Sequence, residues 1–90
     1  MSNETYLNHP TFGLLYRVCL LEEHQELFTT LYAQRLFFLV TVEAKKVSFA
    51  PISRSDARLL VENRLRNLRR RSNMQEFNSL NQTYQQTFSV

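Results

Sequence analysis

The chain has 90 residues, of which 43% are hydrophobic, 12% aromatic and 21% charged, and its formal net charge is +3 at pH 7. This size predicts one compact domain, or a smaller one with an appendage, and leaves little room for an enclosed substrate cavity. The single glycine excludes a glycine-rich phosphate loop, and the single cysteine excludes an internal disulfide. Cys19 is interpreted as a small buried hydrophobe in a reducing compartment.

The first ten residues, MSNETYLNHP, lack the basic and apolar regions of a signal peptide. The longest apolar run, Leu36 to Val42, is too short to span a bilayer. We therefore expect a cytoplasmic protein with no membrane segment.

The first half of the chain has the residue patterns of short β-strands. Alternation along residues 11–20 places Phe12, Leu14, Tyr16, Val18 and Leu20 on one face, and Arg17 and Cys19 on the other. Further strands are expected within 27–33 and 36–43. A last strand is expected over Val47–Phe49, after a turn at Lys45–Lys46 and before Pro51. Four or five short antiparallel strands predict a small, strongly bent barrel over residues 1–53.

Residues 54–90 predict two helices, over about 54–71 and 74–88. Ser53 with Asp56, and Asn73 with Glu76, have the spacing of helix N-terminal caps. Apolar residues recur at helical spacing in both segments: Ala57, Leu60, Val61, Leu65 and Leu68 in the first, and Met74, Phe77, Leu80, Tyr84 and Phe88 in the second. The short link predicts an antiparallel hairpin, with a small core of its own that makes it separable from the barrel.

All excess positive charge lies beyond Ser53, where seven arginines stand against Asp56, Glu62 and Glu76. Such a series can contact the phosphates of nucleic acid. However, these arginines do not share one helix face, and no aromatic stacking pattern accompanies them. We therefore expect these arginines to be solvated or to contact a protein partner. The alternative is a small barrel with a basic helix that binds nucleic acid directly.

The remaining polar residues do not form a convincing chemical site. His9, His24 and Cys19 lack the spacing of metal ligands, and Glu22-Glu23-His24 has the composition of a solvated loop. His9, which precedes Pro10, is interpreted as a turn residue. We therefore expect no metal, no cofactor and no enzymatic activity.

The segment LYAQRLFFLV, Leu31 to Val40, is the best candidate for a binding site. Gln34 and Arg35 interrupt its apolar run, and a tyrosine beside an arginine on a rigid sheet edge is typical of protein-interface hot spots. Strand alternation leaves two positions open for Tyr32. It points outward if Leu27 and Leu31 face the core, or it packs with Phe28 inside the core.

Three runs resemble the PipX family of small cyanobacterial proteins that interact with PII: YLNHPTFGLLY (6–16), ELFTTLYAQRLFFLV (26–40) and ARLLVENRLRNLRR (57–70). The resemblance covers nearly the whole chain. It implies a Tudor-like (SH3-like) antiparallel β-barrel, followed by a C-terminal two-helix hairpin.

The resemblance also implies two exchanging partners: the trimeric nitrogen-signalling protein PII, and NtcA, a transcription regulator of the catabolite-activator type. In that family, PII sequesters the protein when 2-oxoglutarate is scarce. Abundant 2-oxoglutarate, with ATP, releases it to act as a coactivator of NtcA, and these effectors bind the partners. Other transcription components are further candidate partners, and no direct DNA contact is expected.

Carried onto this sequence, the resemblance implies one surface for both partners, with Tyr32 exposed on it. The residues are Tyr6 and Phe12 from the first run, Tyr32, Gln34, Arg35, Leu36 and Phe38 from the second, and Glu4 just outside the matched runs. The family's helices also contact PII.

Overall fold

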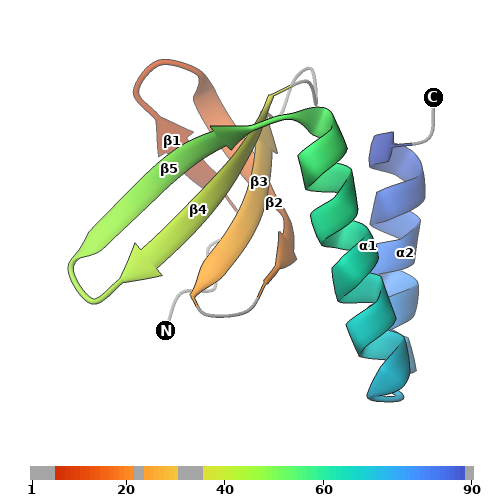
Figure 1. Cartoon of the computed structure of the whole chain (residues 1–90). Helices are drawn as coiled ribbons and strands as arrows, with labels where there is room; N and C mark the ends of the chain where they lie inside the picture. The colour runs from red at the N-terminus through yellow and green to blue at the C-terminus, as the bar shows by residue number, and fades with distance from the viewer. Residues whose placement is uncertain (1–5, 22–23, 31–35, 89–90) are drawn as a thin grey trace.

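The computed structural model describes residues 6–21, 24–30 and 36–88, and shows a curled sheet beside a pair of helices (Figure 1). The five strands are β1 (Tyr6–His9), β2 (Gly13–Leu20), β3 (Gln25–Thr30), β4 (Phe37–Glu43) and β5 (Lys46–Ile52). They pair antiparallel in chain order, and the sheet curls into a half-barrel. Two helices follow, α1 (Arg54–Arg70) and α2 (Met74–Phe88). The predicted fold class, a small antiparallel barrel followed by a helical hairpin, is confirmed.

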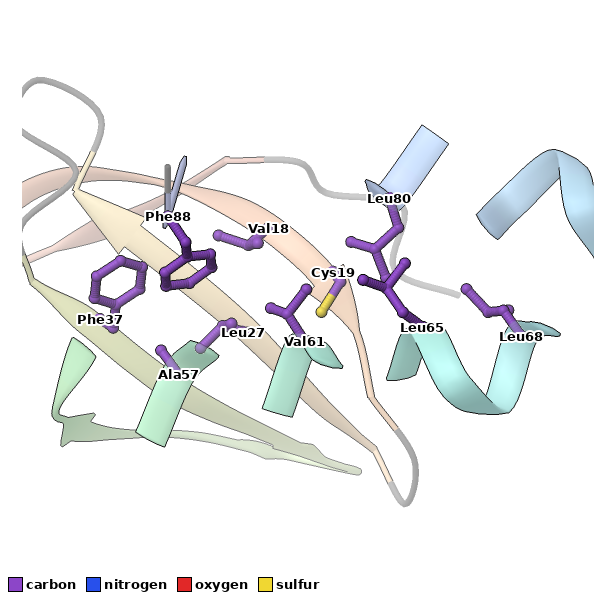
Figure 2. Packing of buried hydrophobic residues seen from close by; sticks show 10 residues of the cluster. All are labelled: Val18, Cys19, Leu27, Phe37, Ala57, Val61, Leu65, Leu68, Leu80 and Phe88. Atoms are coloured by element: carbon purple, nitrogen blue, oxygen red, sulfur yellow. The ribbon is translucent and has the colours of Figure 1, made fainter. Parts of the chain in front are cut away.

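Both faces of the curled sheet are buried, each in its own core. Inside the curl, Leu15, Phe28, Phe38 and Val40 form one cluster. The other face lies under the helices, where Leu27 and Phe37 from the sheet meet residues of α1 and α2 (Figure 2). The full membership of this second cluster is Val18, Cys19, Leu27, Phe37, Ala57, Val61, Leu65, Leu68, Leu80 and Phe88. We call it the shared core.

The shared core is larger than the core that the sequence predicts for the hairpin alone, because it also includes sheet residues. The helical stripe of α1 is buried as predicted at Ala57, Val61, Leu65 and Leu68. This stripe packs against sheet residues as well as against α2, because the outer face of the sheet carries apolar side chains that are stable only when buried from solvent. The hairpin and the sheet are therefore stabilised by the same buried residues.

The simple alternation expected for residues 11–20 is wrong in detail. Leu15 is fully buried and Leu14 only half-buried, although the pattern counts Leu14 and omits Leu15 from its apolar face. The pairing register then shifts between Arg17 and Cys19, so Val18 and Cys19 are both buried. A β-bulge inserts one extra residue and breaks the two-residue period, and burial on both faces of the sheet weakens the apolar–polar contrast.

The ends of the sheet also differ from the sequence expectation. Tyr6–His9 forms an additional strand, and the β4–β5 turn lies at Ala44–Lys45, one residue earlier than expected. The last strand continues through Pro51 to Ile52. Proline is tolerated there because β5 is an edge strand with β4 as its one neighbour in the sheet, so the missing N–H removes no hydrogen bond to a strand on the other side.

Both predicted helix caps are present. The amide of Asp56 donates to Ser53 Oγ at 3.0 Å, and the amide of Glu76 donates to Asn73 Oδ1 at 3.3 Å. Ser72, in the turn between the helices, has a φ of 59°, a conformation that commonly ends a helix. Neither α1 nor α2 combines the length and apolar character required to cross a membrane.

Candidate protein-binding surface

Several predicted contact residues lie at one end of the sheet. At this end β2 begins, β3 ends and β4 begins, because consecutive antiparallel strands reverse direction. The turn that joins β1 to β2 and contains Phe12 lies at this end, in the upper part of Figure 1. The strand register places Thr30 and Leu36 at the same end. We call this region the Phe12 end of the sheet.

Two apolar side chains are exposed at the Phe12 end. Phe12 is 47% exposed and Leu36 is 43% exposed. The backbone of Leu36 is fixed, because its carbonyl oxygen accepts hydrogen bonds from Thr29 Oγ1 at 2.8 Å and from the Thr30 amide at 3.1 Å. A rigid backbone that presents large apolar side chains to solvent is the arrangement that a protein interface uses.

The other two described site residues have different environments. Tyr6 is 52% exposed. It is the register partner of Tyr16, which is paired with Thr29, which in turn is paired with Phe37. Register partners lie on the same face of a sheet, so Tyr6 lies on the face that the helices cover, as Phe37 does. Phe38 is only 2% exposed, with its ring centroid 5.6 Å from that of Phe12. Phe38 therefore supports Phe12 from inside the curl and offers a partner almost no surface.

Four of the predicted site residues, Glu4, Tyr32, Gln34 and Arg35, lie outside the described residues. Thr30 and Leu36, which flank residues 31–35 in the chain, are both at the Phe12 end. The positions of Tyr32, Gln34 and Arg35 in the interface remain predictions.

His9 has a larger part in this region than the sequence indicated. Its ring centroid lies 5.0 Å from Phe12, 5.1 Å from Phe38 and 5.2 Å from Phe49. These residues come from one turn and two distant strands, so no local pattern reveals their contact. The only sequence signal is the His-Pro pair followed three residues later by glycine, which is typical of a tight turn.

A shallow groove lies between β2 and α2, away from the Phe12 end. Its volume is about 250 Å³, and Arg17, Cys19 and Glu76 contribute to its lining. Arg17 pairs with Glu26, and Glu76 pairs with Arg64, each at 3.2 Å. Burial raises the pKa of the Cys19 thiol to about 12, and the positive charges of Arg64 and Arg17 offset only part of that rise. The thiol is therefore protonated and unreactive near neutral pH.

The arginines of the hairpin make contacts within the chain. Arg54 donates to the Thr87 carbonyl oxygen at 2.9 Å, Arg64 pairs with Glu76, and the Arg69 guanidinium lies over the Phe77 ring at 6.0 Å.

Arg58 donates hydrogen bonds to Glu62 and to the Tyr84 hydroxyl. The hydrogen bonds that Arg58 Nε donates to Tyr84 and Glu62 raise the pKa of Arg58, and the hydrogen bond that the Tyr84 hydroxyl donates to Glu62 is the main cause of the lowered pKa of Glu62. Within 6–21, 24–30 and 36–88, no three His, Cys, Asp or Glu side chains cluster as metal ligands.

A small curled sheet with exposed apolar residues on a rigid end, beside a helical hairpin, has the features of a protein-binding module. The family model described as PipX, PII-interacting protein X, matches residues 3–88, and the chain belongs to this family. A search of curated proteins returns no match. The match confirms the resemblance noted from the sequence and gives the chain a regulatory role through interaction with PII.

Proposed function

We propose that this chain is a non-enzymatic, cytoplasmic regulator of nitrogen control that exchanges between two proteins. PII sequesters it when 2-oxoglutarate is scarce. When 2-oxoglutarate and ATP are abundant, it leaves PII and binds NtcA as a coactivator. Membership of a family of PII-interacting proteins supports the first partner, and the resemblance that identified the family suggests the second.

The observation that carries the exchange is the exposure of Phe12 and Leu36 at one end of the sheet. A standard protein interface buries roughly 800 Å² on each partner, so a partner that covers Phe12 would occupy that whole end. Two proteins that both use it cannot bind together. Mutually exclusive binding is what a switch between sequestration and coactivation requires.

The effector acts on the partners in this proposal, and the chain responds to their changes in affinity. A ligand shifts such an equilibrium only by the difference between its affinities for the two states. 2-Oxoglutarate with ATP therefore weakens the PII complex by favouring the form of PII that binds this chain poorly.

The test is a competition experiment with purified proteins. Labelled chain is bound to PII, and NtcA is added with or without 2-oxoglutarate and ATP. We expect NtcA to displace PII only when both effectors are present. Phe12→Ala should weaken both complexes. Val47→Ala serves as the matched control, because Val47 is equally exposed at 47% but lies beside the β4–β5 turn. A stable ternary complex through the same surface would contradict the proposal.

Direct nucleic-acid binding is the competing function, favoured by the seven arginines after Ser53. The contacts of Arg54, Arg58, Arg64 and Arg69 within the chain argue against it. A side chain held by an internal partner must give up that partner to neutralise a phosphate.

A further inference from the structure

The turn between β1 and β2 is closed by His9 and Gly13. These two residues are register partners, so Pro10, Thr11 and Phe12 form a three-residue loop between the strands. Gly13 has a φ of +76°, a left-handed conformation that glycine adopts without strain and that this type of hairpin loop requires. The loop presents Phe12, which is 47% exposed.

The imidazole of His9 accepts hydrogen bonds from the loop backbone. Its Nδ1 atom accepts from the Thr11 amide at 3.0 Å and from the Phe12 amide at 3.2 Å. Pro10 has no N–H, so these are the only two backbone donors within the loop. A ring nitrogen that accepts hydrogen bonds carries no proton, and neutral His9 therefore has its proton on Nε2.

The same ring joins the loop to the inside of the sheet. It contacts Phe38 of β4 and Phe49 of β5, with centroid distances of 5.1 and 5.2 Å, as well as Phe12 at 5.0 Å. Phe38 is 2% exposed, so it provides a fixed support. One side chain thus holds the loop backbone through Nδ1 and packs between the exposed Phe12 and the buried core.

We propose that His9 is a positioning residue for partner binding: its Nδ1 fixes the loop so that Phe12 is held in the conformation that PII contacts. This inference rests on the proposed function, in which Phe12 belongs to the shared surface. Holding Phe12 in place before binding lowers the entropy cost of ordering it in the complex.

Two substitutions of His9 distinguish the role of its hydrogen-bond acceptor, Nδ1, from the role of its ring packing. Asparagine places an oxygen where Nδ1 stands and can accept from the same amides as an Asx turn, but it has no ring. Phenylalanine keeps a ring against Phe38 and Phe49 but has no acceptor. The experiment measures binding of full-length wild-type, His9→Asn and His9→Phe chains to purified PII, and amide exchange at Thr11 and Phe12 in each free chain.

We expect His9→Phe to bind PII about tenfold more weakly, as the loss of two hydrogen bonds predicts, and His9→Asn to bind within about threefold of wild type. Thr11 and Phe12 amides should exchange faster in His9→Phe only.

The opposite order, with His9→Asn weaker than His9→Phe, would show that only ring packing matters and would overturn the proposal. Equal binding by all three chains would overturn it as well. If wild type does not bind PII, the proposed function fails. Amide exchange then decides the positioning role by itself: protection lost in His9→Phe and kept in His9→Asn supports it, and equal protection overturns it.

Discussion

The ring of Phe37 on β4 stacks against the ring of Phe88 in the last turn of α2, with centroids 5.4 Å apart and 18° between the ring planes. These residues are far apart in the chain, and their contact joins the end of the hairpin to the sheet. Phe37 is 1% exposed and Phe88 is 8% exposed. The last turn of α2 is therefore part of the shared core.

The first prediction concerns Phe88. Phe88→Ala should lower the free energy of unfolding by about 3 kcal/mol, because a buried aromatic ring is lost and a cavity remains under Phe37. Leu59→Ala is the matched control, since Leu59 is 54% exposed and its removal should change stability by less than about 0.5 kcal/mol. Denaturant unfolding of both variants provides the measurement.

A chain shortened to residues 1–53 extends this prediction. Without the helices, Val18, Leu27 and Phe37 lose their cover, and we expect the shortened chain to be unfolded or aggregated. Cooperative unfolding of the isolated sheet, with native-like strand content by circular dichroism, would contradict the shared core and restore the separable hairpin expected from the sequence.

A second prediction concerns Arg54, the first residue of α1. Its guanidinium lies 5.3 Å from the Phe88 ring centroid, and it donates to the Thr87 carbonyl oxygen at 2.9 Å. Arg54→Met keeps an apolar stem but removes the donor, and should cost about 1 kcal/mol. Amides in the last turn of α2 should exchange faster with solvent. Arg70→Met, at the other end of α1, should leave their exchange unchanged; equal exchange in both variants would show that Arg54 does not hold the helix end.

A third prediction follows from the buried thiol of Cys19. Burial raises its pKa from 9.0 to about 12. Above about pH 9 the unfolded chain ionises this thiol while the folded chain keeps the proton, so this group's contribution to stability falls by up to about 1.4 kcal/mol per pH unit. Cys19→Ala lacks this contribution. The stability difference between wild type and Cys19→Ala should therefore narrow from about pH 8 to about pH 10.5 in denaturant unfolding. Parallel pH profiles would mean that the thiol is accessible to solvent.

The parts of the fold that the sequence predicts well are those fixed by local chemistry. Ser53 and Asn73 were recognised as caps because their bonds reach only three residues along the chain. The buried stripe of α1 follows from its helical period. The helical spacing of apolar residues does not predict what this stripe packs against, because the facing sheet residues come together only in the folded protein.

The candidate site shows the same limit. Phe12 and Phe38 were both predicted contact residues, yet Phe12 is half exposed and Phe38 is buried. Sequence alternation cannot separate them, since both faces of the sheet are apolar. The contribution of His9 was missed because its contacts with Phe38 and Phe49 depend on the curl of the sheet.

A fourth prediction tests the nucleic-acid alternative. The free chain should give no shift of duplex DNA at about physiological salt, because phosphate contacts by Arg58 or Arg64 would compete with their bonds to Glu62 and Glu76. PII binding in the same buffer shows that the sample is active. A DNA complex whose affinity falls steeply with salt, with a slope that indicates several phosphate contacts, would favour the alternative.

The last prediction concerns Tyr32, which the family resemblance places on the surface for both partners. Tyr32→Ala should weaken binding to PII and to NtcA by roughly 2–4 kcal/mol, about thirtyfold or more, while the melting temperature stays unchanged. Phe28→Ala is the comparison for a core aromatic, because Phe28 is 1% exposed and its loss should cost about 3 kcal/mol of folding stability. The family resemblance also implies that Arg35 is exposed, and an exposed arginine can be removed with little effect on folding. Arg35→Ala should then weaken both affinities and leave the melting temperature unchanged. Thermal melts measured beside both affinities separate the two positions of Tyr32, and unchanged binding to both partners by a well-folded Tyr32→Ala chain would remove this residue from the interface.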